Sequence, residues 1–406
     1  MGIDKKKKKR DKTRLILKEK NMYKAFLILA VPVMGANFLK ALHDMVDTFF
    51  VGQMPDSVAA QAGMSISWPL LNILMCFNAG LAVAGVAVIS QFIGSGDKAE
   101  AKKYSGLLLT AALVMGVLIN GLLYFLAPNV MRMMGAEGEV LKCAVDYLQI
   151  RAFEMVFVFL FTAFQAIRQS QGDTVTPVIL SVISIVINII FTGIFIRVMG
   201  LGVKGAAYAT VLGQIVITPF ILWELFGAET MLKLNINDLR VEKKGMLKLI
   251  RIATPSAGSQ ALSSLGFLIL QAVILDYGSE VSAAFSIGNK ISNMLLIVVM
   301  ALGNVLAAFV GQNVGAGNKE RAKKSYIVSR NIALVITIVG VLLLFPIREY
   351  AVRLLSNSEE TIAVAMEYMF WVLLTQPMMA LFQNYIGVFN GSGNTKLSLI
   401  MSTVRL

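Results

Sequence analysis

Residues 91–103 read QFIGSGDKAEAKK, and residues 312–324 read QNVGAGNKERAKK. Seven of these thirteen positions are identical at an offset of 221 residues. The same offset pairs Arg132 with Arg353, well beyond the two loops. An offset held over such a length indicates an internal repeat, so the chain contains two copies of one structural unit.

Each copy is made of apolar segments. Hydrophobic residues make up 57% of the 406, charged residues only 15%, and the mean hydropathy is +0.72. Stretches such as 106–127 and 178–196 contain no charged side chain. A membrane-spanning helix needs roughly 20 mostly apolar residues, and continuous rather than alternating apolar runs favour helices over barrel strands. Eleven such segments begin near residues 24, 64, 104, 143, 177, 205, 249, 282, 325, 361 and 397.

Lysine and arginine are distributed unevenly between the two ends of these segments. The N-terminal tail and the loops after even-numbered segments hold 26 of the 37, and the loops after odd-numbered segments hold 6. This is the positive-inside bias, and it predicts a multi-pass protein of the cytoplasmic (inner) membrane with its N-terminus in the cytoplasm. The net charge of +13 then reflects topology, and we expect no nucleic-acid partner.

The repeat predicts an all-α integral membrane protein with two six-helix lobes. Each copy spans six segments, an even number of membrane crossings. Both copies therefore start on the same side of the membrane. Such lobes are related by a pseudo-twofold axis along the membrane normal, with a cleft between them. We expect a basic cytoplasmic tail at 1–23, an N-terminal lobe at 24–226, a cytoplasmic linker at 227–248 and a C-terminal lobe at 249–406.

Metal and enzyme chemistry are not expected. The chain has one histidine, and Cys76 and Cys143 do not have metal-ligand spacing, so a zinc site is excluded. No Ser/His/Asp or paired acidic motif lies on a loop, which argues against catalysis. We expect no cofactor and no obligate protein partner. The partners predicted are the lipid bilayer and small amphiphilic molecules.

Three motifs resemble those of the multidrug and toxic compound extrusion (MATE) transporters. Residues 46–52 read VDTFFVG after an early Pro32, as in the first helix of that family. The two repeated loops are similar to its Gln-x-x-Gly-x-Gly turns. Residues 168–177 are similar to its loop between helices 4 and 5, with Gln169 where a glycine is usual. The likeness runs from about residue 21 to the end of the chain, in both copies.

The resemblance implies a secondary active efflux antiporter that exports amphiphilic, often cationic compounds in exchange for H⁺ or Na⁺. A wide cleft with apolar walls suits such cargo. Three alternatives stay open: a lipid-linked-precursor flippase of the same fold, an integral-membrane transferase, and a homologue or fragment that does not transport. The flippase would need a more cationic cavity, and the transferase would need a catalytic constellation at the water interface.

The first segment carries its polar residues on one face. At about 100° per residue, Asn37, Lys40, His43, Asp44 and Asp47 share an arc of about 120°. A charged face is costly against lipid, so we expect it to line the lobe interior or the cleft. Asn37, Lys40, His43 and Asp44 are candidate cavity-lining residues. An ion pair of Lys40 with Asp44 at i,i+4 is the alternative.

Two other sets of charges lie inside apolar segments. Arg151 and Glu154 are three residues apart on one helical face, which predicts an internal ion pair rather than a site. The sequence allows two interpretations of Lys290: it forms an ion pair with a carboxylate, or it lies near the cleft.

The resemblance also implies a cation-coupling site in the first lobe. One branch of the family uses a helix-1 Asp, an Asn and an Asp four apart on helix 5, and a helix-6 Thr. The matching positions are Asp47, Asn188 and Thr210, and Thr192 stands where the second acid is expected. A lone carboxylate in a poorly hydrated lobe is readily protonated, and oxygen ligands also suit Na⁺. Both ions remain open.

The second copy is shorter than the first. After Thr174 the first copy continues for about 58 residues, but only eleven residues follow the paired Thr395. We therefore expect a truncated second lobe with helices 7–10, the start of helix 11 and no helix 12.

Overall fold

The structure is a computed structural model that describes residues 13–52, 57–353, 355–356 and 358–405. Within these ranges, the side chains at residues 44, 45, 47–49, 51, 52, 57, 58 and 279 are not described. The described residues are almost all helical, with no strand among them.

The helices follow one another along the chain with short connections. Their bounds are α2 Thr13–Lys18, α3 Met22–Gly52, α4 Ser57–Ser95, α5 Lys98–Met133, α6 Gly138–Ser170, α7 Val175–Gly193 continued by η1 Ile194–Val198, α8 Gly202–Leu222 continued by η2 Trp223–Gly227, η3 Ile236–Leu239, α9 Lys243–Leu275, α10 Ser279–Gly315, α11 Lys319–Arg353, α12 Glu359–Ser392 and α13 Thr395–Arg405.

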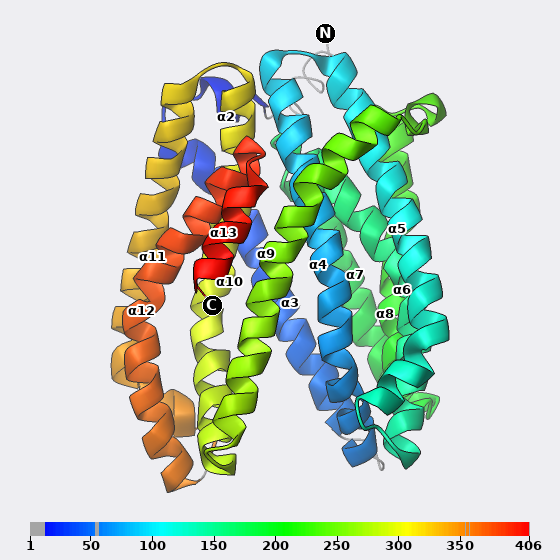
Figure 1. Cartoon of the computed structure of the whole chain (residues 1–406), viewed down its shortest axis with the longest axis vertical. Coiled ribbons are helices and arrows are strands. Elements are labelled where there is room, and N and C mark those ends of the chain that lie inside the picture. The colour runs from blue at the N-terminus through cyan, green and yellow to red at the C-terminus, as the bar shows by residue number, and fades with distance from the viewer. Residues whose placement is uncertain (1–12, 53–56, 354, 357, 406) are drawn as a thin grey trace.

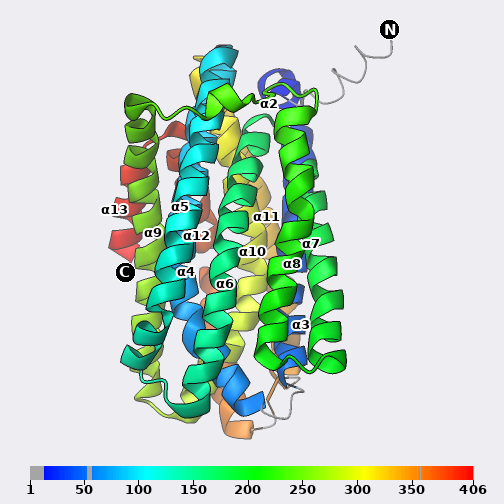
Figure 2. The ribbon, with the colours of Figure 1, turned by 90° about the vertical axis from the view of Figure 1, so that its right-hand side faces the viewer.

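Ten of the described helices, α3 to α12, are long and apolar enough to cross a membrane. They stand side by side as one upright bundle (Figures 1 and 2). The eleventh predicted segment, near residue 397, is the 11-residue helix α13. The predicted all-α membrane fold is therefore confirmed. Its backbone polar groups are satisfied within the helices, as a lipid environment requires.

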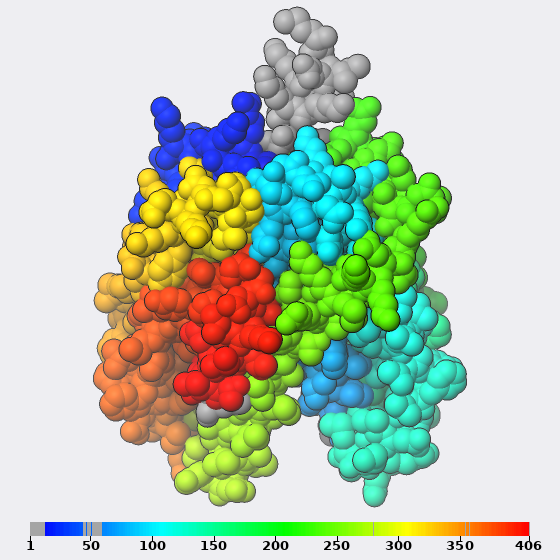
Figure 3. Space-filling view, turned by 45° about the horizontal axis from the view of Figure 1, so that its top comes forward, coloured from blue at the N-terminus to red at the C-terminus, as the bar shows by residue number. Residues whose placement is uncertain are grey.

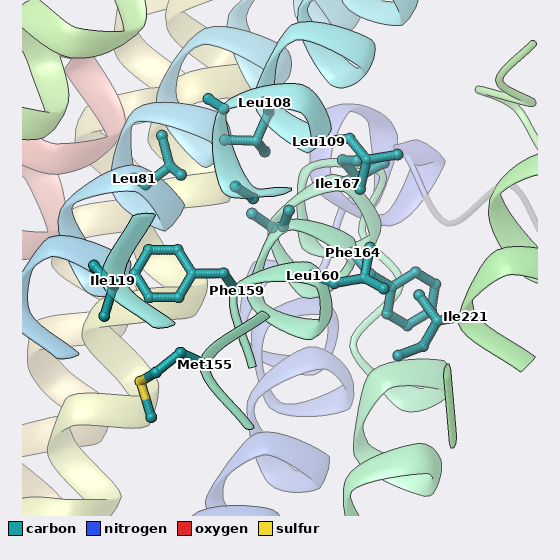
Figure 4. Packing of buried hydrophobic residues seen from close by; sticks show 14 of the residues in the cluster. Leu81, Leu108, Leu109, Ile119, Met155, Phe159, Leu160, Phe164, Ile167 and Ile221 are labelled. Carbon is teal, nitrogen blue, oxygen red and sulfur yellow. The ribbon is translucent and has the colours of Figure 1, made fainter. Parts of the chain in front are cut away.

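The first lobe has its own core between α4, α5, α6 and α8. Phe159 and Phe164 of α6 are fully buried there against leucines of α5 and Ile221 of α8 (Figure 4). Such burial contributes roughly 1.5–3 kcal/mol for each large apolar side chain in water. In a membrane the same contacts act through close packing, because lipid is as apolar as the core.

The first helix of each repeat contacts both lobes. The upper half of α3 packs on α10: the rings of Phe26 and Phe309 lie 5.2 Å apart, and Val33 shares a core with Leu302. Farther along, α3 packs on α7 of the first lobe. In the second repeat, α9 packs on α4 of the first lobe and on α13 of its own. These exchanged contacts hold the lobes together and repeat the pseudo-twofold relationship.

The segments outside the lobes are shorter than predicted. Part of the predicted tail forms α2, where Ile16 is fully buried and the Arg321 side chain donates to the carbonyls of Ile16 and Glu19. The predicted linker 227–248 ends six residues early, at residue 242, because α9 begins at Lys243. The remaining linker lies across α5, where Asp238 forms an ion pair of 3.1 Å with Lys102.

Candidate functional site

A polar cluster lies inside the first lobe around Asn188 of α7. The Asn188 side chain is buried, and its Nδ2 donates to the Thr210 Oγ1 of α8 over 3.0 Å. The Thr210 hydroxyl in turn donates to the carbonyl of Ala206 over 2.9 Å. The structure thus brings together Asn188 and Thr210, which the family resemblance implies lie in one site.

The amide oxygen of Asn188 accepts two further hydrogen bonds. Thr192, one turn along α7 and fully buried, donates from Oγ1 over 3.3 Å. The His43 Nε2 of α3 lies 2.7 Å from the same oxygen. Since the amide nitrogen already faces Thr210, the oxygen is the acceptor, and His43 Nε2 carries the proton. His43, expected only to line a cavity, is therefore a member of the cluster.

Close packing of α7 on α8 makes this geometry possible. A Cβ at Gly213 of α8 would lie 2.8 Å from the carbonyl oxygen of Ser184, so only glycine allows the two helices to approach this closely. Ser184, Asn188 and Thr192 follow one another at i,i+4 on the buried face of α7. The sequence therefore places a polar stripe where α7 meets α3 and α8.

The two acids of the predicted site lie outside the described side chains. Asp44 and Asp47 belong to α3, and Asp47 is one helical turn beyond His43. Their convergence with Asn188 remains a prediction.

Of the other candidate cavity-lining residues, Asn37 contacts the second lobe. The half-buried Asn37 donates from Nδ2 to the carbonyl of Ile297 in α10 over 3.5 Å. Lys40 is exposed and forms no ion pair with any carboxylate whose side chain the structure describes. This face of α3 therefore lies at the junction of the lobes.

Two ion pairs with a buried carboxylate lie in the first lobe. The predicted pair is confirmed: Arg151 Nε lies 2.9 Å from Glu154 Oε2, and Glu154 is buried. A second pair joins Arg168, at the end of α6, to Glu224 of η2, and both side chains are buried. Sequence reasoning missed this second pair because its partners are 56 residues apart and no spacing connects them.

The two repeated loops form the predicted tight turns after α4 and α10. Gly96 and Gly317 have φ values of 83° and 72°, which favour glycine. The turns also meet: a Cβ at Gly94 would overlap the carbonyl oxygen of Gln312, and one at Gly315 would overlap that of Gln91.

Side-chain hydrogen bonds extend this junction in both directions. Gln91 Nε2 donates to the Gly391 carbonyl of α12 over 3.3 Å, and Gln312 Nε2 donates to the Ser170 carbonyl of α6 over 2.6 Å. The donors are 221 residues apart, and so are the acceptors. We call these contacts of Gln91, Gln312 and the glycines at 94 and 315 the glutamine clasp.

The lobes separate toward the opposite end of the bundle. The space-filling view shows a hollow between the lime-green ends of α9 and α10 and the teal ends of α5 and α6, with part of α4 visible in it (Figure 3). The surface of the described bundle is therefore closed at the clasp and open at the other end.

Comparison with known proteins agrees with this architecture. The sequence model of the MatE family matches residues 32–194 and 255–406, one block in each repeat. The chain is 25% identical over 354 residues to the probable multidrug resistance protein YoeA of Bacillus subtilis, covering 85% of this chain and 76% of YoeA. It is 28% identical over 340 residues to the FAD transporter of Shewanella oneidensis, covering 82% and 73%.

Solved structures show the same fold. A multidrug resistance MATE family transporter of the MOP superfamily, solved in an outward-facing conformation, superposes with a TM-score of 0.89 at 24% identity. The match covers 94% of this chain and 85% of that one. The two matched sequence blocks together span well over half of the 406 residues, one in each lobe. The chain therefore belongs to the MatE family, the multidrug and toxic compound extrusion transporters.

Proposed function

We propose that this chain is a secondary active multidrug efflux antiporter of the cytoplasmic membrane, with the clasp and the N-terminus on the cytoplasmic side. It exports amphiphilic compounds in exchange for a cation. The observation that carries the proposal is the two-lobed bundle, closed by the glutamine clasp at one end and open at the other. A second state with the clasp separated would expose the cleft to the cytoplasm, as alternating access requires.

The coupling cation binds in the first lobe, at Asp47 beside Asn188, Thr192 and Thr210. Neutralising a carboxylate there changes how α3 packs between α7 and α10. Because α3 touches both lobes, such a change shifts the equilibrium between the outward-facing and inward-facing states.

The geometry favours H⁺ over Na⁺. Sodium would need oxygen ligands with available lone pairs. The amide oxygen of Asn188 already accepts hydrogen bonds from Thr192 and His43. A proton on Asp47 requires no rearrangement of these donors, whereas a sodium ion competes with them.

Reconstitution of the full chain in proteoliposomes tests this function. Efflux of a fluorescent amphiphile is measured with a pH gradient alone and with a sodium gradient alone. We expect the pH gradient to drive transport and the sodium gradient to fail. If neither gradient drives efflux, the antiport is contradicted, and efflux driven only by the sodium gradient would reverse the choice of ion.

A further inference from the structure

We propose that the inter-lobe cleft binds amphiphiles through an anionic group, such as a carboxylate, sulfonate or phosphate, held between Lys40 of α3 and Lys290 of α10. This inference rests on the proposed transport function and names the substrate chemistry. Both lysines are exposed in the structure. Neither forms an ion pair with a carboxylate among the described side chains.

Lys290 lies on the face of α10 that meets the first lobe. Ala308 is 18 residues later, five full turns at about 100° per residue, and it packs in the core of the first lobe. Asn304 and Ile297, at nearly the same angle, accept hydrogen bonds from Gln169 and Asn37. On the side of these contacts away from the glutamine clasp, the lobes separate. Lys290 and the neighbouring exposed Asn293 therefore face the cleft.

Lys40 lies on the corresponding face of α3. Phe26 and Val33, 14 and 7 residues earlier, pack against α10 at nearly the same helical angle. Lys40 continues that face on the open side of the contact between Asn37 and Ile297. A lysine facing lipid here would be costly, but a water-filled cleft keeps its ammonium group hydrated.

The two ammonium groups are within reach of one bound anion. The helices α3 and α10 are antiparallel and meet where Asn37 contacts Ile297. Lys40 is three residues beyond this contact and Lys290 is seven residues before it, about 4 and 10 Å along the axes. Both therefore lie on the open side, about 6 Å apart along the bundle, which two long lysine side chains easily span.

The helices that form the lobe interface carry few other charges. Residues 57–95 of α4 have none, and the four basic residues of α9 lie within its first nine positions, at the clasp end. The acid of α10 is Glu280 in its first turn. On α3 the sequence adds Lys24 in the first turn, at the clasp end, and the two acids Asp44 and Asp47. Lys40 and Lys290 are therefore the lysine and arginine residues of these four helices that lie outside the clasp end.

Dye binding to the purified full chain tests the proposal without any ion gradient. Fluorescein and rhodamine 123 share a xanthene core but carry opposite charge. Their affinities are measured by fluorescence polarisation in nanodiscs of phosphatidylcholine. We expect fluorescein to bind, and Lys290→Gln or Lys40→Gln to weaken it about tenfold or more, because removing one partner of a desolvated charge pair is costly. Lys290→Arg should restore most of the affinity.

Lys244→Gln, at the exposed start of α9, is the matched control and should change nothing. Equal fluorescein affinity in wild type and Lys290→Gln would overturn the proposal, as would parallel loss of both dyes. Phosphatidylglycerol that displaces fluorescein from wild type would identify a lipid headgroup as the anion, and an absence of displacement would identify a soluble compound. Because no transport is measured, dye binding that survives in a chain unable to transport would separate this inference from the proposed function.

Discussion

Gln91 and Gln312 make the same contact in opposite directions. Each glutamine side-chain amide donates to a backbone carbonyl of the other lobe. The glutamine's own backbone carbonyl touches a glycine of the other turn. The repeat visible in the sequence is thus a junction in space. A symmetric junction can open in one step, because the same bonds break on both sides of the pseudo-twofold axis.

Substitution of the clasp glycines should open this end of the bundle. The Cβ of Gly94→Ala would overlap the carbonyl oxygen of Gln312, a backbone atom that cannot move aside alone. We expect spin labels at Asp97 and Asn318, in the two turns, to show a longer distance by double electron–electron resonance. Gly121→Ala in α5, which meets no atom within 4 Å, is the control. An unchanged distance distribution in Gly94→Ala would mean that the clasp does not hold the closed state.

The buried pair of Arg168 and Glu224 should contribute to stability rather than transport. Removing one partner leaves a buried charge without its counter-ion, at a cost of roughly 3–5 kcal/mol. We therefore expect Arg168→Leu to lower the melting temperature strongly, and Arg168→Leu with Glu224→Leu to recover much of the loss. Lys142→Leu, which breaks an exposed pair with Glu139, should change it little. Thermal unfolding in detergent measures this, and no recovery in the double variant would refute the coupling.

Sequence reasoning found most of the fold but only part of the site. Hydropathy and the repeat predicted the ten long helices, because spanning a bilayer demands a length and composition that the sequence records directly. Asn188 and Thr210 were found through family resemblance. The contact of His43 with Asn188 was not predicted. Helical periodicity gives the polar face of α3 but does not show which neighbouring helix that face meets. The clasp was visible as a repeat, yet nothing in one sequence shows that two turns touch.

The Asn188 cluster should couple ion binding to transport. Asn188→Leu removes the acceptor of Thr192 and His43 and the donor to Thr210. The net loss of a hydrogen bond inside a protein costs roughly 0.5–1.5 kcal/mol. We expect gradient-driven efflux to fall at least about tenfold. Thr218→Val is the control, since among the described residues Thr218 bonds only to the carbonyl of Gln214 in its own helix. Full efflux in Asn188→Leu would remove this residue from the coupling site.

The orientation of the chain can be tested with thiol labelling. We expect Lys243→Cys, at the start of α9, to react only with reagent that reaches the cytoplasm, in a background lacking Cys76 and Cys143. An exposed position at the other end, Tyr277→Cys, should react with impermeant reagent added outside. Labelling of Lys243→Cys from outside intact cells would invert the topology and place the open cleft on the cytoplasmic side.

We propose that a cation on Asp47 drives the exchange between outward-facing and inward-facing states. The most direct measurement compares wild type with Asp47→Asn in proteoliposomes, following substrate efflux under an imposed pH gradient and substrate exchange without a gradient. We expect Asp47→Asn to lose gradient-driven efflux while substrate exchange and binding persist. Wild-type efflux in Asp47→Asn vesicles under the same gradient would contradict it.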